Sequence, residues 1–426
     1  MAKKYIIEGG YPLKGKITPN GNKNAALPIL AATILTDEEV ILRNVPDIED
    51  VNIMIKILGE LGKKIEKIDE HCYKFSGVVT SNSINSELGR KIRTSILFVG
   101  PMLARIGEIE LPPPGGDVIG RRRLDTHFLA LSKLGSSVDV TSTFKLTANK
   151  LVGKDIFLDE ASVTGTENAV MAAVLAEGQT ILMNAASEPH VQDLCNLLNQ
   201  MGANIDGIGS NILRIKGVQK LHGTDFTIGM DFMEVGSLIG LAAVTRSELE
   251  ILNCQPENMN MARLTFGKLG IRWETDGKSI FMPGHQELKV QSDIGGMIPK
   301  IDDAPWPGFP PDLMSIVIVT ATQVEGTVLV FEKMFESRMF FVDKLVSMGA
   351  KIILCDPHRA VITGPAHLRG TTLTSPDIRA GMALVIAALC AEGKSTIHNV
   401  IQIERGYENL PAKLRSLGAH ISVVED

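Results

Sequence analysis

The sequence has few cysteines, no long hydrophobic run and no excess of positive charge. Its five cysteines are scattered through 426 residues and lack the Cys-x-x-Cys or Cys/His spacing of a metal site, so we expect reduced, mostly buried thiols. The longest apolar run, residues 380–391, is too short to span a bilayer and predicts a buried helix. The first ten residues contain no apolar signal core, and we expect a cytoplasmic protein.

The charge balance narrows the classes of partner. A formal net charge of -6 argues against a nucleic-acid-binding protein, which usually presents a basic face. A hydrophobic content of 44% and a charged content of 22% are ordinary for a globular chain of this length, which is long enough for two domains. We expect no nucleic acid, no membrane and no obligatory protein partner.

One short phrase occurs six times along the chain. It consists of a hydrophobic residue, two spacers, a second hydrophobic residue, a glycine and then β-forming residues, as in LGELGKKI and LRSLGAHI. The glycines recur at intervals of 67 to 79 residues: Gly62, Gly135, Gly202, Gly270, Gly349 and Gly418. Such a period indicates one supersecondary unit used repeatedly. In each copy we expect a helix that ends in a left-handed glycine cap, followed by a strand.

A second phrase, a helix, a polar turn and a strand that ends in asparagine, precedes most of these copies. The asparagines are Asn44, Asn184, Asn253 and Asn399; the fifth repeat has Glu332 instead, and the second has the longer stretch IGEIELPPPGG. Each repeat is therefore about 70 residues of helix–strand–helix–strand, too short to stand easily alone. Six repeats therefore predict two α/β domains of three repeats each, with the link between the domains near Gly229–Met230. The first strand, residues 4–8, precedes the first repeat; pairing with the second half would make that domain discontinuous.

Two departures from the repeat carry charged residues suited to anions. In GNKNAALP, Lys23 and Asn24 open a helix, whose N-terminus favours negative charge, although a surface lysine beside a capping asparagine is the commoner explanation. The insertion LPPPGGDVIGRRRLDTH, residues 111–127, places Asp117 before Arg122 and Arg123. It predicts a lid over an anionic ligand, with a charged surface loop as the alternative.

Further charged residues stand in apolar or turn contexts. They are Arg93, Asp312, Arg338, Arg379 and Arg405. Singly, each is more often part of a structural ion pair than a ligand contact. Because arginines recur at expected helix starts, we expect them to converge in a cleft that holds phosphate and carboxylate groups.

Together these motifs match a known family over essentially the whole chain. With GNKNAALP, the GG-x-x-IG-x-R loop, ASVTGTEN, NAASEP, PGFPPD, FESR, DIRAG and RGYE, the sequence resembles the UDP-N-acetylglucosamine 1-carboxyvinyltransferases, a family of enolpyruvyl transferases. The resemblance implies two inside-out α/β domains of three repeats each, residues 23–229 with a lid at 111–123, and residues 1–22 plus 230–426, with a cleft between them.

The resemblance also implies an activity. The enolpyruvyl group of phosphoenolpyruvate would pass to the 3-hydroxyl of UDP-N-acetylglucosamine with release of phosphate, in peptidoglycan synthesis and hence cell-wall biogenesis, cell shape, division and the cell cycle. Addition and elimination through a tetrahedral intermediate would need an acid, a base and cations, and neither a metal nor an organic cofactor.

Residue roles carry over by motif only. Asp117, Asp312, Lys23 and Arg405 would be catalytic, with Asp312 as the base. Phosphoenolpyruvate would be held by Lys23, Asn24, Arg122 and Arg405. The sugar nucleotide would meet Asn24, Arg93, Arg122, Arg123, Asp125, Thr126, Ser162, Val163, Asp312 and Met334. Arg338 and Arg379 would line the cleft and help closure.

The sequence departs from the commonest family pattern at two positions. Most members have cysteine where this chain has Asp117, and a carboxylic acid can still donate a proton if its pKa is raised. The antibiotic fosfomycin alkylates that cysteine, so the resemblance implies an enzyme insensitive to it. Many members have proline in place of Arg123, at a position where the resemblance implies a contact with the uridine.

Two rival interpretations stay open. The sister transferase that acts on shikimate 3-phosphate would need a Lys-Ser-x-Ser-like start and a Gly-Asn-Ala-Gly-Thr stretch, and neither is found. An inactive regulatory paralogue would be expected to lose Lys23, Asp312 or Arg405, and all three are present.

Overall fold

The computed structural model describes residues 3–116 and 123–425, which form two compact units. The continuous unit starts at Gly21 and ends at Gly229. The discontinuous unit combines the segment up to Asn20 with Met230 onward. Each unit has its own hydrophobic core, and no residue is shared between the two. No helix in the described part of the chain is long and apolar enough to cross a membrane.

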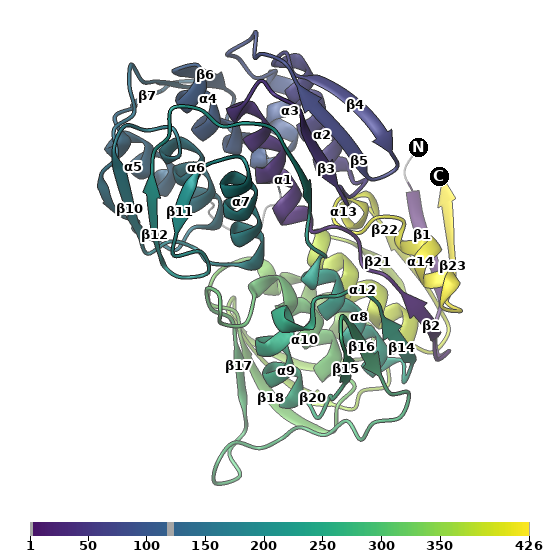
Figure 1. The fold of residues 1–426 in the computed structure, drawn as a ribbon. Coiled ribbons are helices and arrows are strands. Elements are labelled where there is room, and N and C mark those ends of the chain that lie inside the picture. Colours follow the sequence, from purple (N-terminus) through teal and green to yellow (C-terminus); the bar gives the residue numbers. More distant parts are fainter. Residues whose placement is uncertain (1–2, 117–122, 426) are drawn as a thin grey trace. The chain divides into compact units, whose positions relative to one another are not determined.

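The continuous unit contains three sheets among its described residues (Figure 1). In spatial order they are β13 (Thr224–Thr227), β3 (Val40–Arg43), β5 (Cys72–Ser76) and β4 (Lys64–Asp69); β11 (Asn204–Asp206), β12 (Ile212–Lys216), β10 (Gln179–Met183) and β9 (Asp155–Phe157); and β6 (Glu108–Leu111), β8 (Phe144–Thr147) and β7 (Ser137–Val140). The helices are α1 (Lys23–Ala32), α2 (Glu49–Glu60), α3 (Ser86–Lys91), α4 (Val99–Arg105), α5 (Asp125–Leu134), α6 (Val163–Ala173) and α7 (Pro189–Gln200), with the short 3-10 helices η1 (Thr33–Leu35) and η2 (Arg93–Phe98).

The discontinuous unit repeats this plan. Its sheets are β21 (Thr372–Thr374), β22 (Lys394–His398), β1 (Lys3–Glu8) and β23 (His420–Glu425); β15 (Glu274–Asp276), β16 (Ser279–Met282), β14 (Glu248–Ile251) and β2 (Lys14–Ile17); and β17 (Lys300–Asp302), β18 (Gly326–Phe331), β20 (Arg359–Gly364) and β19 (Lys351–Asp356). Its helices are α8 (Phe232–Val244), α9 (Asn260–Gly267), α10 (Met314–Ala321), α11 (Val342–Ser347), α12 (Ile378–Cys390), α13 (Ile401–Glu404) and α14 (Leu410–Ser416), with η3 (Pro256–Met259), η4 (Pro311–Leu313) and η5 (Arg338–Phe341).

Helices fill the centre of the discontinuous unit, and the sheets lie outside them (Figure 1). Every residue of α8 and α10 is buried, as is α12 except for its last residue, and the three helices pack against one another. A helix that is apolar on all sides is stable only when it is surrounded by protein. The predicted buried helix over residues 380–391 is thus confirmed as α12, and so is the inside-out α/β fold class.

The six repeated glycines have the predicted left-handed backbone. Their φ angles lie between 78° and 112°, a region that side chains with a Cβ rarely adopt. The strand-end residues Asn44, Asn184, Asn253 and Asn399 are left-handed as well, with φ between 50° and 59°, which the sequence analysis did not predict. Asparagine tolerates this conformation better than most residues, so the chain turns at the same point in four repeats.

The first strand completes a sheet formed by the end of the chain. β1 lies between β22 and β23 and pairs with both in antiparallel register, Tyr5 facing Ile397 on one side and Val423 on the other. β2 adds a parallel strand to β14. The segment before the first repeat is therefore part of the discontinuous unit.

Candidate active-site residues in each unit

Lys23 is a buried cation at the start of a helix. Asn22 caps α1, its side chain accepting a hydrogen bond from the Ala25 amide at 3.1 Å. The Lys23 Nζ lies 2.7 Å from Asp50 Oδ2, and the two side chains are 9% and 7% exposed. The commoner explanation of the sequence, a surface lysine, is therefore wrong. The helix N-terminus favours negative charge at this point, and the Lys23 ammonium group is held by the Asp50 carboxylate.

Four of the residues predicted to meet the sugar nucleotide, Arg93, Arg123, Asp125 and Thr126, lie in one polar cluster of the continuous unit. Arg93 donates to the carbonyl oxygen of Arg123 at 2.8 Å, and the Arg123 guanidinium pairs with Asp125 at 3.0 Å. Thr126 donates to Asp159 at 2.7 Å. The structure thus brings together side chains from η2 and from the first turn of α5, which lie more than thirty residues apart in the sequence.

Ser162 and Val163 border this cluster at the start of α6. Ser162 is the N-cap of the helix and accepts a hydrogen bond from the Gly165 amide at 3.2 Å. A Cβ atom on Gly165 would lie 3.0 Å from Ser162 and 3.1 Å from the Thr126 methyl group, so the two helix starts touch at this glycine. Asn24, the remaining candidate in this unit, is half-buried in the first turn of α1.

Two candidate residues, Asp117 and Arg122, lie outside the described residues. The same holds for residues 117–122 of the predicted lid at 111–123. The prediction that Asp117 donates a proton and that Arg122 binds anions therefore stays a prediction.

In the discontinuous unit, Asp312 lies between two nearly buried guanidinium groups. Its Oδ1 accepts a hydrogen bond from Arg338 Nη2 at 3.0 Å, and its Oδ2 accepts one from Arg379 Nε at 3.0 Å. The arginine side chains are 5% and 6% exposed, whereas Asp312 keeps 25% of its side chain accessible. Asp312 is thus the most accessible of the three side chains.

Arg379 is itself fixed by a polar chain. Its Nη1 donates to the Tyr407 hydroxyl at 3.2 Å, and that hydroxyl lies 2.8 Å from Ser237 Oγ. The motifs PGFPPD, FESR, DIRAG and RGYE thus meet around Asp312, and of the charged residues expected to converge, Asp312, Arg338 and Arg379 do so.

The other two candidates of this unit are more accessible. Met334 is 40% exposed between β18 and η5, and its backbone amide donates to Glu332 Oε1 at 3.2 Å. Arg405 is the C-terminal cap of α13 and donates from Nη1 to Gln402 at 2.8 Å.

Sequence reasoning missed a buried polar group in each unit. His127 is 1% exposed: its Nδ1 accepts from Asn168 at 2.9 Å and its Nε2 faces Thr164 Oγ1 at 3.1 Å. In the discontinuous unit, Asp303 and Glu332 are both fully buried. The sequence did single out Glu332 as unusual, because it stands where four other repeats have asparagine.

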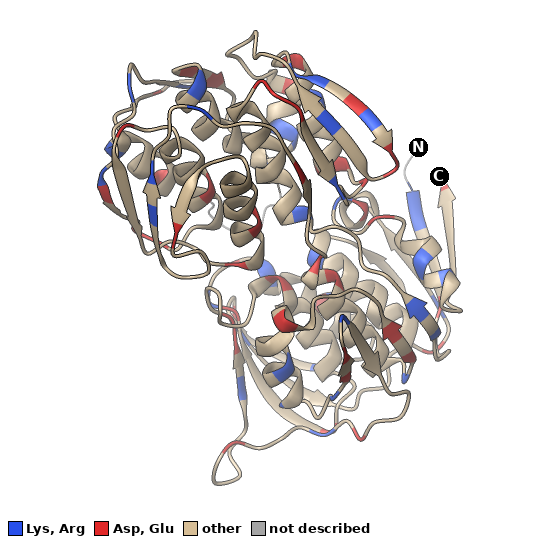
Figure 2. Ribbon diagram, in the orientation of Figure 1, with Lys and Arg blue, Asp and Glu red and all other residues tan. Residues whose placement is uncertain are grey.

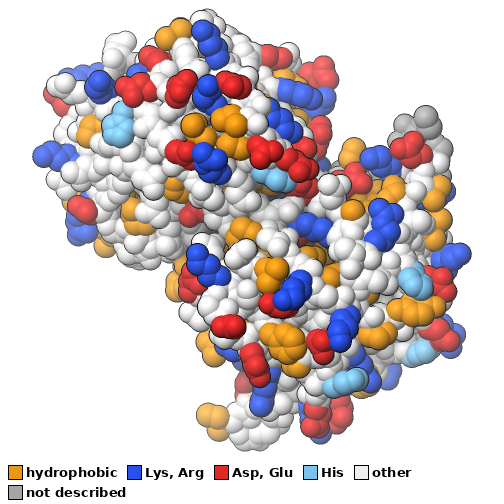
Figure 3. Space-filling model, turned by 45° about the vertical axis from the view of Figure 1, so that its right-hand side comes forward, with side chains coloured by type: hydrophobic (Ala, Val, Ile, Leu, Met, Phe, Trp, Pro, Cys, Tyr) orange, Lys and Arg blue, Asp and Glu red, His pale blue; other side chains and the backbone are white. Residues whose placement is uncertain are grey.

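Charge does not separate the candidate residues from the rest of the surface. Lysine, arginine, aspartate and glutamate are interspersed along both units (Figure 2), and the face drawn in Figure 3 likewise mixes basic and acidic side chains. Lys23, Arg338 and Arg379 are distinguished instead by being nearly buried and paired with carboxylates.

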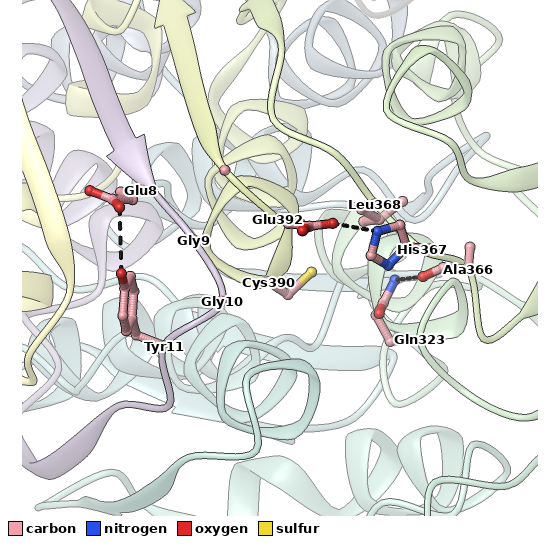
Figure 4. Close-up of a pocket in the computed structure, with 11 residues that line it drawn as sticks. Glu8, Gly9, Gly10, Tyr11, Gln323, Ala366, His367, Leu368, Cys390 and Glu392 are labelled. Atoms are coloured by element: carbon pink, nitrogen blue, oxygen red, sulfur yellow. Dashed lines mark hydrogen bonds and ion pairs between the residues drawn. The ribbon is translucent and has the colours of Figure 1, made fainter.

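A surface pocket of about 420 Å³ lies elsewhere in the discontinuous unit (Figure 4). Among its lining residues, His367 pairs with Glu392 at 2.6 Å and Gln323 donates to the Ala366 carbonyl at 3.1 Å. The lining contains no lysine, no arginine and none of the predicted site residues. A site without a cation is poorly suited to phosphorylated substrates, so we do not assign this pocket to the reaction.

Comparisons with known proteins decide the family. The model of the family described as EPSP synthase (3-phosphoshikimate 1-carboxyvinyltransferase) matches residues 7–414. The chain belongs to the enolpyruvyl transferases. Proteins named UDP-N-acetylglucosamine 1-carboxyvinyltransferase from Treponema denticola and Borreliella burgdorferi are 62% and 60% identical to it over 423 residues, with 99% of each chain covered.

Solved structures of this family share the fold at low sequence identity. The enolpyruvyl transferase NikO from Streptomyces tendae matches with a TM-score of 0.88 at 22% identity over 99% of both chains. EPSP synthase from Acinetobacter baumannii matches with a TM-score of 0.77 at 17% identity over the whole of both chains. The fold expected from the six repeats is therefore that of the enolpyruvyl transferases.

Proposed function

We propose that this enolpyruvyl transferase moves the enolpyruvyl group of phosphoenolpyruvate to the 3-hydroxyl of UDP-N-acetylglucosamine and releases phosphate, a step of peptidoglycan synthesis. The observation that carries the proposal is the identity of 62% over 99% of a relative with that name. The geometry around Asp312 supports the chemistry, because two guanidinium groups hold its carboxylate in place while 25% of its side chain stays accessible.

In the addition step, the sugar oxygen forms a bond to C2 of phosphoenolpyruvate. Asp312 accepts the proton of the 3-hydroxyl, and a proton is delivered to the C3 methylene, a role that we assign to Asp117. In the elimination step, the C2–O bond to phosphate breaks, the methyl group loses a proton, and phosphate leaves with the electron pair of that bond.

The cations are proposed to hold the anionic groups of both substrates. Lys23, with the N-terminus of α1, and Arg405 suit the phosphate and carboxylate of phosphoenolpyruvate, together with Arg122 and Asn24. The cluster of Arg93, Arg123, Asp125 and Thr126, with Ser162 and Val163, is assigned to the sugar nucleotide, with Met334 as a further contact. Arg338 and Arg379 are assigned to the orientation of Asp312.

A cytoplasmic location and roles in cell shape, division and the cell cycle belong to this proposal, as does insensitivity to fosfomycin. No cofactor and no protein partner are required by the steps above. The alternative acceptor is shikimate 3-phosphate, which the name of the matching family model suggests.

A phosphate-release assay tests the proposal. We expect turnover with phosphoenolpyruvate plus UDP-N-acetylglucosamine and none when shikimate 3-phosphate replaces the sugar nucleotide. Turnover with phosphoenolpyruvate plus shikimate 3-phosphate, and none with UDP-N-acetylglucosamine as the acceptor, would reverse the assignment. Binding of both substrates by calorimetry without phosphate release would support the inactive paralogue.

A further inference from the structure

Three repeats end a strand with the same side-chain hydrogen bond. In each, an asparagine follows a strand and donates from Nδ2 to the carbonyl oxygen of the residue that follows the neighbouring parallel strand. The pairs are Asn44 to Ile228 at 2.9 Å, Asn184 to Leu158 at 3.0 Å and Asn399 to Ser375 at 2.8 Å. The repeat therefore puts a hydrogen-bond donor at this position.

The fifth repeat has a carboxyl group at each of these two positions. β17 and β18 are parallel, with Asp302 facing Phe331, so the next residues along the strands are Asp303 and Glu332. Neither backbone is left-handed, and both side chains turn inward, where they are 0% exposed. At the position where three other repeats have a hydrogen-bond donor, the fifth repeat therefore has the acid Glu332. The neighbouring position holds a second acid, Asp303.

Each carboxyl group has one oxygen in use and one without a partner. Asp303 Oδ1 accepts the Lys333 amide at 2.5 Å, and Glu332 Oε1 accepts the amides of Met334 and Phe335, both at 3.2 Å. Asp303 Oδ2 and Glu332 Oε2 have no hydrogen-bond partner within the described ranges. An unsatisfied buried oxygen is costly, and one proton between the two groups would satisfy both.

Electrostatics favour one proton on this pair. Burial raises the pKa of Glu332 to about 9; the Arg338 guanidinium opposes the shift, while the neighbouring Asp303 carboxyl group adds to it. Two buried carboxyl groups at neighbouring positions of parallel strands cannot both be ionised without a large cost.

We propose that Asp303 and Glu332 share one proton and act as a positioning pair for Arg338 and, through it, for Asp312. Glu332 Oε2 lies 3.9 Å from Arg338 Nε, whose Nη2 holds Asp312 at 3.0 Å. The same pair holds the three backbone amides that carry Met334. This inference rests on the proposed function, because it takes Asp312 as the base.

The groups that face Glu332 come from four elements. Arg338 on η5 is the cation beside it and Asp303 after β17 is the acid; Asp312 on η4 lies beyond Arg338. His358, in the β19–β20 turn, has its Nδ1 2.7 Å from the Glu332 carbonyl oxygen, and the Lys333 ammonium is paired with Asp302 at 2.7 Å instead. When Asp303 and Glu332 hold one proton between them, they present one negative charge to Arg338. When they hold no proton, they present two negative charges.

Kinetics of Glu332→Gln give the first test. Glutamine keeps the shape of a neutral glutamic acid and can donate to Asp303, so we expect its kcat at pH 7.5 to stay within about threefold of wild type. At pH 10 the wild type should lose about tenfold in kcat as the second carboxyl group ionises, while the variant should not. Other groups that titrate near this pH are common to both proteins and cancel in the ratio.

Two further variants separate hydrogen bonding from charge and from folding. Glu332→Ala should lose at least about tenfold in kcat, because the amides of Met334 and Phe335 and the acid Asp303 lose their partner. The matched control is Glu392→Gln, an exposed glutamate paired with His367, which should keep the wild-type pH profile. A Glu332→Gln enzyme as impaired as Glu332→Ala would overturn the proposal, because the ionised form would then be required.

Stability against pH tests the shared proton without using activity. The pKa of Glu332 is raised in the folded state, so its contribution is fully present below its ordinary value of 4.5 and is lost as the pH rises toward 9. Between these values the folded-to-unfolded ratio of wild type should fall, relative to Glu332→Gln, by up to tenfold per pH unit in urea titrations. A ratio that does not change with pH would show that Glu332 is ionised. If no substrate pair gives turnover, the proposed function fails, and this measurement still decides the protonation of the pair.

Discussion

At the scale of single residues, Asp312 is the test of the proposed chemistry. Asp312→Asn keeps the size of the side chain and an acceptor for one arginine, but it removes the base. We expect sugar-nucleotide affinity by calorimetry to change little and kcat to fall by ~10²–10⁴-fold. Asp343→Asn, which alters an exposed aspartate paired with Lys344, is the control. Turnover close to wild type in Asp312→Asn would remove this residue from the mechanism.

Asp117 gives a second prediction, about covalent inhibition. A carboxylate is a poor substitute for a thiolate as an attacking group, and the five cysteines of the chain all lie outside the 111–127 insertion. Fosfomycin should therefore leave the intact mass of the wild-type protein unchanged, whereas Asp117→Cys should stay active and gain one adduct with time. Asp117→Ala should lose most turnover for lack of a proton donor. An adduct on wild type that maps to Asp117 would contradict the argument.

At the scale of elements, one histidine–asparagine pair joins four helical segments of the continuous unit. His127 on α5 accepts from Asn168 on α6, which also donates to the Ile96 carbonyl in η2 at 2.8 Å and accepts the Gly100 amide of α4 at 2.8 Å. Because Nδ1 accepts, Nε2 carries the proton and donates to Thr164. The network needs a neutral imidazole.

The same histidine predicts a loss of stability in acid. Burial, and secondarily Arg93, lowers the pKa of His127 to about 3, so the folded state excludes a proton that the unfolded state binds below about 6.5. Stability should fall by up to about 1.4 kcal/mol per pH unit between pH 6.5 and 3 from this group alone. Urea unfolding of His127→Gln should show a shallower pH dependence, while the exposed His285→Gln should match wild type. If the free energy of unfolding changed with pH equally in all three proteins, His127 would have to be protonated in the folded state.

How much of these elements could be predicted depends on whether the cause is local. The six glycine caps are local, because a left-handed residue after a helix demands glycine, and all six were predicted. The burial of Lys23 was not predicted, because it depends on Asp50, which belongs to another helix. The junction of Asp312, Arg338 and Arg379 depends on three separate chain segments, which spacing alone cannot bring together.

At the scale of the whole molecule, the two units differ in how they can be separated. The continuous unit has its own core and all the strands of its sheets within residues 21–229, so this fragment should unfold cooperatively when expressed alone, by circular dichroism in urea. Residues 230–426 lack β1 and β2, which belong to two of their sheets, and should be unfolded or aggregated. Adding a peptide of residues 1–20 should restore structure. A 230–426 fragment that unfolds cooperatively without the peptide would show that β1 is dispensable.

The position of β1 between β22 and β23 sets an order of events on the ribosome. Its strand is the first to be synthesised, but its two neighbours are among the last. At ~5–20 residues per second, roughly 20 to 80 s separate the synthesis of β1 from that of its partners. During this interval the continuous unit can fold, while Tyr5 and Ile7, fully buried in the finished protein, remain without their sheet. β1 therefore remains an unpaired apolar strand while residues 9–393 are synthesised, a natural binding segment for a chaperone that recognises extended hydrophobic peptides.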